Sequence, residues 1–341
     1  MKYSIFNFKQ ILKAPFRGLG VIVLVLASFT LHAQQDAHYS LYMFNGLYLN
    51  PAYAGSHEVV DLMGIYRHQW AGIDGAPRTG NISVHGALPR NQYGLGLTLF
   101  GDHLGLTTSF SATGSFAYRI KVKQTRICLG VSAGATYFHQ DNTSAIPTEL
   151  ANQGYYDQMF AVNKSLVIPN IGAGIYVYGK RYYVGFSVPH ILPSSLNKKL
   201  ELNATNAVAH QYNHYLLTAG VIIGKETSKV KARPSFLMKY VKGVDKNIPD
   251  FDVSLGLLFV DRFWLGATYR LASGLDNKKG TAVVAWFECK ITQQLRFGYG
   301  FDYSLNKLNS FAKYGSHDIM LGYEFNTGKK RFVSPRYVSY F

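Results

Sequence analysis

Charged residues are scarce in this sequence. Asp, Glu, Lys and Arg make up 16% of its 341 residues, well below the roughly 25% that is typical of soluble globular proteins. Long apolar runs are also missing, because no interior stretch reaches the ~18 apolar residues that a membrane helix needs. Aromatic residues, by contrast, make up 15% of the chain, and Tyr and Phe suit strands and membrane interfaces. Low charge without membrane helices therefore favours membrane-spanning strands.

Cysteine is nearly absent as well. The two cysteines, Cys128 and Cys289, lie in separate apolar runs, so we expect small apolar residues facing lipid or lumen rather than a disulfide. Acidic residues number 19 against 35 Lys and Arg, which gives a formal net charge of +16. This excess is spread over predicted loops and turns without forming a patch, so nucleic acid is not an expected partner.

The N-terminus has the pattern of a cleaved secretory signal peptide over residues 1–33. A basic region without acidic residues precedes an apolar run, residues 19–31, of about 13 residues, which is too short to span a membrane as a helix. Cleavage is expected after Ala33. The residue at the minus-three position, Leu31, is not small, so the sequence does not fix which peptide bond is cleaved. No cysteine lies nearby, so a lipoprotein anchor is not expected, and the alternative is a retained membrane anchor.

From Val59 onward, apolar and polar residues alternate with a period of two, which predicts half-buried strands. In residues 109–120, for example, Phe110, Phe116 and Tyr118 fall on one face of the predicted strand, and serines and an arginine fall on the other. About fourteen such runs occur, each near the ~10 residues of a membrane strand. Their approximate starts are Val59, Thr79, Tyr93, Ser109, Arg126, Ile168, Tyr182, His214, Lys231, Phe251, Phe263, Thr281, Leu295 and His317.

Two features distinguish a membrane barrel from a soluble sandwich. First, the strand charges keep to the polar register, as they must where a charge facing lipid costs about 2–4 kcal/mol. Second, short and long connections alternate, for example residues 122–125 and then 139–167, as short periplasmic turns and long outer loops do. The charges in question are Arg119, Arg233, Lys239, Asp252, Arg270, Glu288, Arg296, Asp302, Asp318 and Glu324.

We therefore predict an all-β protein, a transmembrane antiparallel β-barrel of about 14 strands over residues 59–325. It is expected in the outer membrane, in contact with outer-membrane lipid. Residues 34–58 are expected to form a periplasmic or lumenal segment, and residues 326–341 a periplasmic tail. The long connections then lie outside the cell.

Patterns of catalytic and metal sites are incomplete. His57-Glu58 begins a zinc-protease motif whose second histidine is missing. The Gly-x-Gly segments at residues 94–96 and 172–174 do not open a helix, so we interpret their glycines as relieving crowding in curved strands. Residues 102–105 are expected to form a tight loop, with a cation site as the less favoured alternative. We expect no catalytic residue, no metal and no cofactor.

The most distinctive motifs lie near the N-terminus of the mature chain. They are Tyr42-Met43-Phe44-Asn45, Asn50-Pro51-Ala52-Tyr53-Ala54-Gly55, Tyr66-Arg67-His68-Gln69-Trp70 and Gly75-Ala76-Pro77. Later pieces are Gly94-Leu95-Gly96-Leu97, Phe116-Ala117-Tyr118-Arg119 and Val184-Gly185-Phe186-Ser187-Val188-Pro189-His190. Together these motifs resemble the PorP/SprF family of Bacteroidetes outer-membrane proteins over nearly the whole mature chain.

That resemblance implies a role in the type IX secretion system and in gliding motility. Members of the family work beside a secreted cargo protein, often a large adhesin, and some contact periplasmic components of the machinery. The candidate partner-binding residues, taken from the resembling motifs, are Asn50, Pro51, Tyr53, Gly55, Arg67, Trp70 and Pro77.

The same residues also have an interpretation from local chemistry. Asn50-Pro51 favours a turn and Gly55 permits a positive φ, so this segment is expected to form a rigid corner before the first strand. Trp70 falls in the apolar register at the outer end of that strand, where an aromatic belt would lie. Arg67 falls in the polar register, and the alternative to partner contact is a lumenal salt bridge to an acid such as Glu288 or Glu324.

Two other classes of function remain as alternatives. A passive channel or fatty-acid-type transporter has a similar strand count, and a transporter should show an N-terminal plug or an apolar tunnel. A secretion partner should instead lack steady conductance and copurify with a large protein. An outer-membrane lipase or protease is disfavoured, because no catalytic set is visible.

Overall fold

The computed structural model describes residues 39–141, 163–192, 194–195, 210–211, 213–225, 227–241, 249–271, 282–305 and 314–325. The predicted signal peptide and the predicted tail, residues 326–341, lie outside the described residues. Within the described part, no helix is both long enough and apolar enough to cross a membrane.

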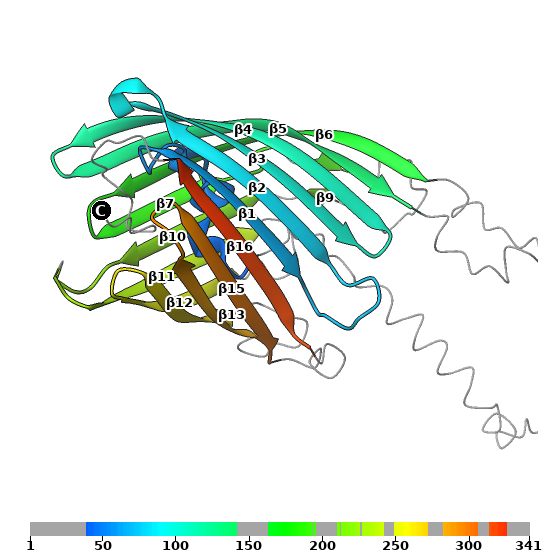
Figure 1. The fold of residues 1–341 in the computed structure, drawn as a ribbon. Helices are drawn as coiled ribbons and strands as arrows, with labels where there is room; N and C mark the ends of the chain where they lie inside the picture. The colour runs from blue at the N-terminus through cyan, green and yellow to red at the C-terminus, as the bar shows by residue number, and fades with distance from the viewer. Residues whose placement is uncertain are drawn as a thin grey trace, which may run out of the picture.

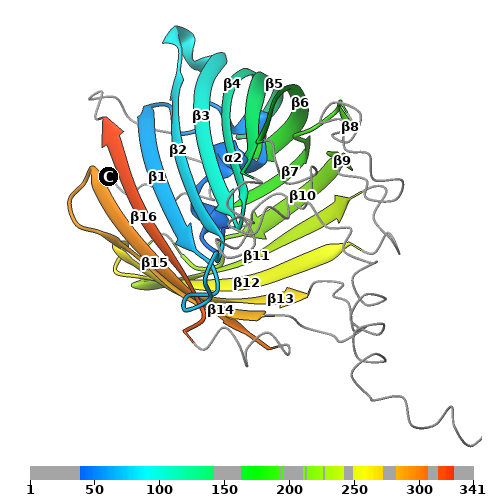
Figure 2. The same ribbon diagram turned by 90° about the vertical axis from the view of Figure 1, so that its right-hand side faces the viewer.

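Fourteen described strands form one closed antiparallel barrel, in which β1 pairs with β16 to complete the circle (Figure 1, Figure 2). Its strands are β1 (Val60–His68), β2 (Arg78–Ala87), β3 (Tyr93–Leu104), β4 (Thr107–Val122), β5 (Thr125–Gln140), β6 (Lys164–Tyr178), β7 (Tyr182–Val188), β10 (His214–Val221), β11 (Val230–Val241), β12 (Asp250–Phe259), β13 (Phe263–Leu271), β14 (Ala282–Lys290), β15 (Leu295–Ser304) and β16 (Ser316–Phe325). A separate pair is formed by β8 (Ser194–Ser195) and β9 (His210–Gln211).

The predicted fold class and strand count are confirmed. All predicted starts lie within two residues of the observed ones except that of β6, which begins at Lys164 instead of near Ile168. The prediction of a loop at residues 102–105 is wrong. β3 continues to Leu104, because its ladder with β4 extends to that residue. The turn is confined to Gly105 and Leu106, and Gly105 has a φ of +56°.

The two faces of each strand differ as the alternation predicted. On β5, Leu129 and Val131 are 46% and 56% exposed on the outer wall, whereas Ser132 is 9% exposed and faces the lumen. Every charge assigned to the polar register is buried or nearly so inside the barrel. Exposed tyrosines mark both ends of the outer wall: Tyr93, Tyr118 and Tyr182 at one end, and Tyr137, Tyr269 and Tyr303 at the other.

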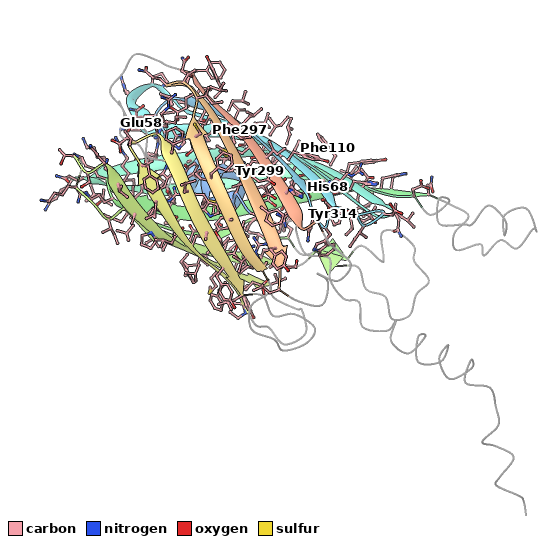
Figure 3. The ribbon with its side chains drawn as sticks, turned by 60° about the horizontal axis from the view of Figure 1, so that its bottom comes forward. Glu58, His68, Phe110, Phe297, Tyr299 and Tyr314 are labelled. Atoms are coloured by element: carbon pink, nitrogen blue, oxygen red, sulfur yellow. The ribbon has the colours of Figure 1, made fainter. Side chains whose placement is uncertain are left out.

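The two ends of the barrel are built differently. Short turns, among them the 3-10 turn η5 (Pro89–Asn91), join strands at one end, which we call the short-turn end. The strand ends that flank the longer connections, such as the end of β5 and the start of β6, all lie at the other, which we call the loop end. Figure 3 separates the two ends by residue, with Glu58 at the short-turn end and His68 and Tyr314 towards the loop end.

Residues 39–59 fill part of the lumen and are called the plug below. The plug contains η3 (Tyr42–Phe44), α2 (Gly46–Leu49) and η4 (Pro51–Tyr53), and Figure 2 shows α2 inside the ring of strands. Nearly every plug residue is buried. The plug enters β1 at the short-turn end, so its path runs down the barrel from the loop end.

Candidate functional site: the plugged lumen

The Asn50–Gly55 corner is bound to the barrel wall. The side-chain amide of Asn50 donates hydrogen bonds to the carbonyls of Ile175 (2.9 Å) and Phe186 (3.2 Å), on β6 and β7. Its Oδ1 accepts the N–H of Ala52 at 2.9 Å, which fixes the first turn of η4 as an N-cap does. Pro51 follows as the first residue of η4, where a missing N–H costs nothing. The corner is thus rigid and anchored at its start.

Glycines on the lumenal wall make room for this corner. A Cβ at Gly130 of β5 would overlap the backbone of Ala52, and one at Gly94 of β3 would overlap the carbonyl of Ala54. A Cβ at Gly174 of β6 would meet the Asn50 side chain. Gly94 and Gly174 belong to the two Gly-x-Gly segments, so the crowding that these glycines relieve comes from the plug.

The end of the corner is held by a buried polar cluster at the short-turn end. The Tyr53 hydroxyl lies 2.8 Å from Nε2 of His57, whose Nδ1 is 3.1 Å from a carboxylate oxygen of Asp61. Gly55, with a φ of +69°, donates its N–H to Nδ1 of His85 at 3.2 Å. The Gly55 carbonyl accepts from Arg119, and Glu58 pairs with Arg126 at 2.5 Å.

His57, Asp61 and His85 are the group among the described residues whose ligand atoms lie close enough to hold a metal ion. The hydrogen bonds argue against that use. Because Nδ1 of His85 accepts the Gly55 N–H, the proton of the neutral ring sits on Nε2, the atom that faces Asp61. Asp61 is also paired with Arg296 through its other oxygen. We therefore interpret the cluster as a latch between the plug and the strands β1, β2 and β15.

A second polar network binds the plug near the loop end. Arg67 of β1 donates to Asp318 at 2.6 Å and to Asp302 at 2.9 Å, and also to the hydroxyl of Ser40 at 2.7 Å. The backbone N–H of Ser40 donates to Asp318 at 2.5 Å. Asp302 also pairs with Arg270 at 2.9 Å. The side chains in this network are at most 13% exposed, so its bonds replace their lost hydration.

The alternative predicted for Arg67, a lumenal salt bridge, is what the structure shows, with different partners. Arg67 lies directly opposite Asp318 in the β1–β16 ladder. Glu324 lies six residues further along β16, opposite Asp61, and Glu288 lies on β14 opposite Gly298. Pairing with Asp318 and Asp302 follows from this register, which the sequence alone does not fix.

An aromatic and cationic cluster completes the plug's contact with the opposite wall. The guanidinium of Arg233 lies 4.4 Å from the ring centroid of Trp264 and 5.4 Å from that of Phe44 in η3. Such stacking stabilises a buried cation. Next to it, the Tyr42 hydroxyl lies 3.3 Å from the Ser254 hydroxyl, and burial raises the pKa of Tyr42 above its ordinary value. Tyr42 therefore stays protonated at physiological pH.

The seven candidate partner-binding residues do not form one site. Asn50, Pro51, Tyr53 and Gly55 lie inside the lumen with the corner, and Arg67 lies in the network at the loop end. Trp70 lies beyond the end of β1, with a φ of +50° and its N–H bonded to Ser316 Oγ at 3.0 Å. Pro77 is buried next to it, and its carbonyl accepts the N–H of Gln69 at 3.0 Å.

Sequence reasoning missed two residues that hold the plug. Ser40 lies before the resembling motifs and has no pattern that marks it. Arg119 was placed on the polar register, yet its carbonyl partner at Gly55 is 64 residues away. Only the pairing of strands brings such groups together.

We compared the sequence and the structure with known proteins. A family profile described as type IX secretion system membrane protein PorP/SprF matches residues 31–323. No curated relative matches the sequence. Among solved structures, the chain is similar to the outer-membrane protein Omp33 of Acinetobacter baumannii, with 8% identity over 80% of this chain and 100% of that one, at a TM-score of 0.43.

It is also similar to a FadL homologue of Pseudomonas aeruginosa, with 10% identity over 81% of this chain and 93% of that one, at a TM-score of 0.43. The family profile spans most of the sequence and includes the plug, both of its polar latches and all of the barrel up to Tyr323. The chain therefore belongs to the PorP/SprF family of type IX secretion system membrane proteins and is an outer-membrane β-barrel of that family.

Proposed function

We propose that this barrel is a non-enzymatic component of the type IX secretion and gliding machinery, which helps to deliver a secreted partner protein or attach it to the cell surface. The observation that carries the proposal is the family profile, which covers residues 31–323. The partners expected are a secreted cargo or adhesin and periplasmic components of the machinery.

The plug bears on the rival function. A passive channel needs an open lumen, whereas here the described residues 39–59 occupy the lumen and are bound at both ends. A transporter of the fatty-acid type would be expected to carry an N-terminal plug, so this observation favours a transporter as the second candidate. Membership of the secretion family is what ranks delivery above transport.

Because the Asn50–Gly55 corner is buried, its effect on a partner protein would be indirect. Asn50 and Tyr53 are 2% and 1% exposed, so they would act by holding the plug in place and not by touching a partner directly. Trp70 and Pro77 flank the β1–β2 connection at the loop end, where Gly72 and Asp74 are exposed. The connection is held against the β15–β16 side by the bond from the Ala71 N–H to the Gly315 carbonyl, at 2.8 Å. This connection is the surface we propose for partner contact.

Copurification from native membranes tests the proposal. The tagged wild-type barrel should retain a large secreted protein, and Asp74→Lys should reduce its recovery while barrel abundance stays constant. Lys123→Glu, at an exposed residue in the turn between β4 and β5 at the short-turn end, is the control charge reversal and should leave recovery unchanged. The transporter would be favoured instead if the wild-type barrel retained no secreted protein and if cells lacking the barrel grew poorly on one nutrient only.

A further inference from the structure

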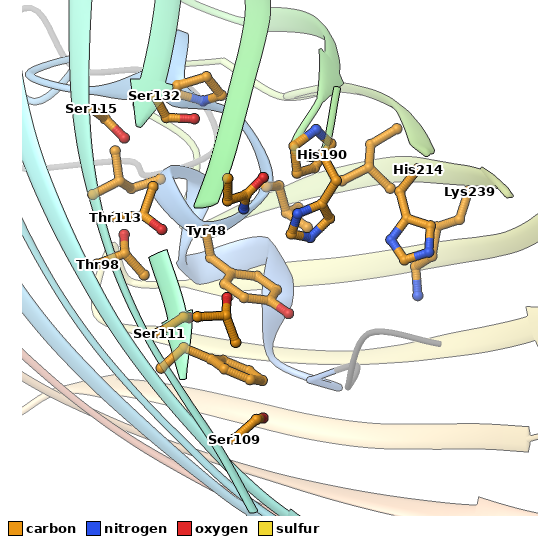
Figure 4. A pocket seen from close by; sticks show the side chains of 18 residues that line it. Tyr48, Thr98, Ser109, Ser111, Thr113, Ser115, Ser132, His190, His214 and Lys239 are labelled. Carbon is orange, nitrogen blue, oxygen red and sulfur yellow. The ribbon is translucent and has the colours of Figure 1, made fainter. Parts of the chain in front are cut away.

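A cavity of about 180 Å³ lies between the plug and the barrel wall (Figure 4). Strands β3, β4 and β5 form one side of it, the opposite side comes from the region of β7, β10 and β11, and α2 of the plug forms the floor. An engineered cavity of roughly 150 Å³ accommodates a benzene molecule, so this space is large enough for one six-membered ring.

One side of the cavity is lined by the hydroxyl groups of Ser and Thr side chains. Ser109, Ser111, Thr113 and Ser115 alternate along β4 and all face the cavity, as the period of two requires. Thr98 of β3 lies beside them at 8% exposure, and its hydroxyl has no hydrogen-bond partner within the described part of the chain. A buried hydroxyl without a partner is costly, so a group that bonds to it inside the cavity would be stabilised.

The floor of the cavity is aromatic. The rings of Tyr48, in α2, and Phe100, in β3, are stacked with an interplanar angle of 18° and centroids 6.0 Å apart. Both rings line the cavity. A surface that offers flat apolar rings beside rows of hydroxyls suits a ligand with one apolar face and many hydroxyl groups, which describes a pyranose sugar.

The side opposite the hydroxyls carries the basic groups. Lys239 of β11 is 6% exposed, and its ammonium lies 4.0 Å from Asp252, a carboxylate that is closer to Arg270 at 3.2 Å. The rings of His190 and His214 stand beside it with centroids 5.7 Å apart. An anionic group entering the cavity would find a desolvated ammonium whose own carboxylate is shared, and charge-assisted hydrogen bonds of this kind are strong.

We propose that this cavity binds a saccharide unit that carries a carboxylate, that is, a sugar acid of the uronate class. The ring lies over Tyr48 and Phe100, its hydroxyls bond to the row on β4 and to Thr98, and its carboxylate pairs with Lys239. The site stands whether or not the barrel delivers a secreted protein, because it rests on the lumen alone.

Calorimetry with the purified full-length barrel in detergent tests the site, with D-glucuronate and D-galacturonate as probes and D-galactose and acetate as controls. At least one uronate should bind, and more tightly than galactose or acetate. Thr98→Val combined with Thr113→Val should weaken uronate binding by about tenfold or more, since each lost hydroxyl removes a hydrogen bond. Thr107→Val, on the same face of β4 but outside the cavity, is the matched control and should bind as the wild type does.

The variant Lys239→Met distinguishes the contribution of the ligand's carboxylate to binding from that of its sugar ring. It should lower uronate affinity about tenfold and bring it to the level of galactose, because the charged contact is lost and the hydroxyl contacts stay. Heat-modifiable migration reports the fold of each variant, and Ser111→Ala replaces the double variant if that one fails to assemble. Absence of binding by both uronates at millimolar concentrations, or equal affinity in Thr107→Val and the cavity variants, overturns the proposal. Equal affinity of wild type for uronate and galactose overturns the assignment of Lys239.

Discussion

Replacing Gly130 with alanine should release the plug without dismantling the barrel. The added Cβ would overlap the backbone of Pro51 and Ala52. Backbone atoms cannot rotate away, and Asn50 fixes this turn by its bonds to Ile175 and Phe186. Overpacking costs about 1–3 kcal/mol, and more where the neighbour cannot move. A cost of about 3 kcal/mol lowers the equilibrium constant for docking of the plug by a factor of about 150.

The barrel itself should tolerate the change. Gly130 keeps its ladder position opposite Ala117 and Gly174, because alanine has a backbone N–H and C=O like glycine. Gly114→Ala is the matched control, since its Cβ would meet only the Ala133 carbonyl at an ordinary 3.7 Å. Planar-bilayer conductance and cleavage within residues 39–59 should both increase in Gly130→Ala and not in Gly114→Ala. Equal conductance in the two variants, with both barrels folded on gels, would refute the docking geometry.

Three further changes probe the wall, the loop-end network and the corner. Leu129→Arg should impair membrane assembly by about 2–4 kcal/mol because it faces lipid, whereas Ser132→Arg, beside the lumenal cavity, should be tolerated better; heat-modifiable migration compares them. Arg67→Met should destabilise the barrel by about 3–5 kcal/mol, since it removes the cation paired with the buried carboxylate of Asp318 and leaves Asp302 with Arg270 alone, and denaturant unfolding should show part of this loss restored by adding Asp318→Asn. Asn50→Ala with Tyr53→Ala should leave the barrel in the membrane but reduce surface labelling of its secreted partner, and a proportional fall in barrel abundance would contradict a role beyond structure.

The barrel could be predicted because its constraints are local. Alternation along one strand separates Leu129 from Ser132 without any knowledge of which strand lies next to it. Antiparallel strands joined by short turns then pair in chain order, so the closed circle follows from the strand count. The exception at β6 fits this account, because its first residues are held by their ladder to β5 and have no alternation of their own.

The lumen could not be predicted in the same way. The polar register predicts that Arg67 faces the lumen, but its partner depends on the register of β1 against β16, at opposite ends of the barrel sequence. The Gly-x-Gly segments indicate that glycine relieves crowding there, yet nothing in them shows that the crowding group is Ala54 or Asn50. Contacts made across a lumen leave no periodic pattern in the sequence. Which residues meet there depends on the pairing of all the strands in the closed barrel.

The position of the plug restricts the order in which this barrel can be completed. Residues 39–59 lead into β1, the strand whose pairing with β16 closes the ring. Ser40 is bound by Asp302 and Asp318, on β15 and β16, while Asp61 of β1 is bound by Arg296 of β15. These bonds cross the closing seam. A plug outside the lumen at closure would have to thread a finished barrel whose interior carries its own buried charges, whereas a plug already inside supplies partners for those charges as the seam forms. The Arg67 network therefore couples plug docking to ring closure, because the plug binds across the β1–β16 ladder that closes the ring.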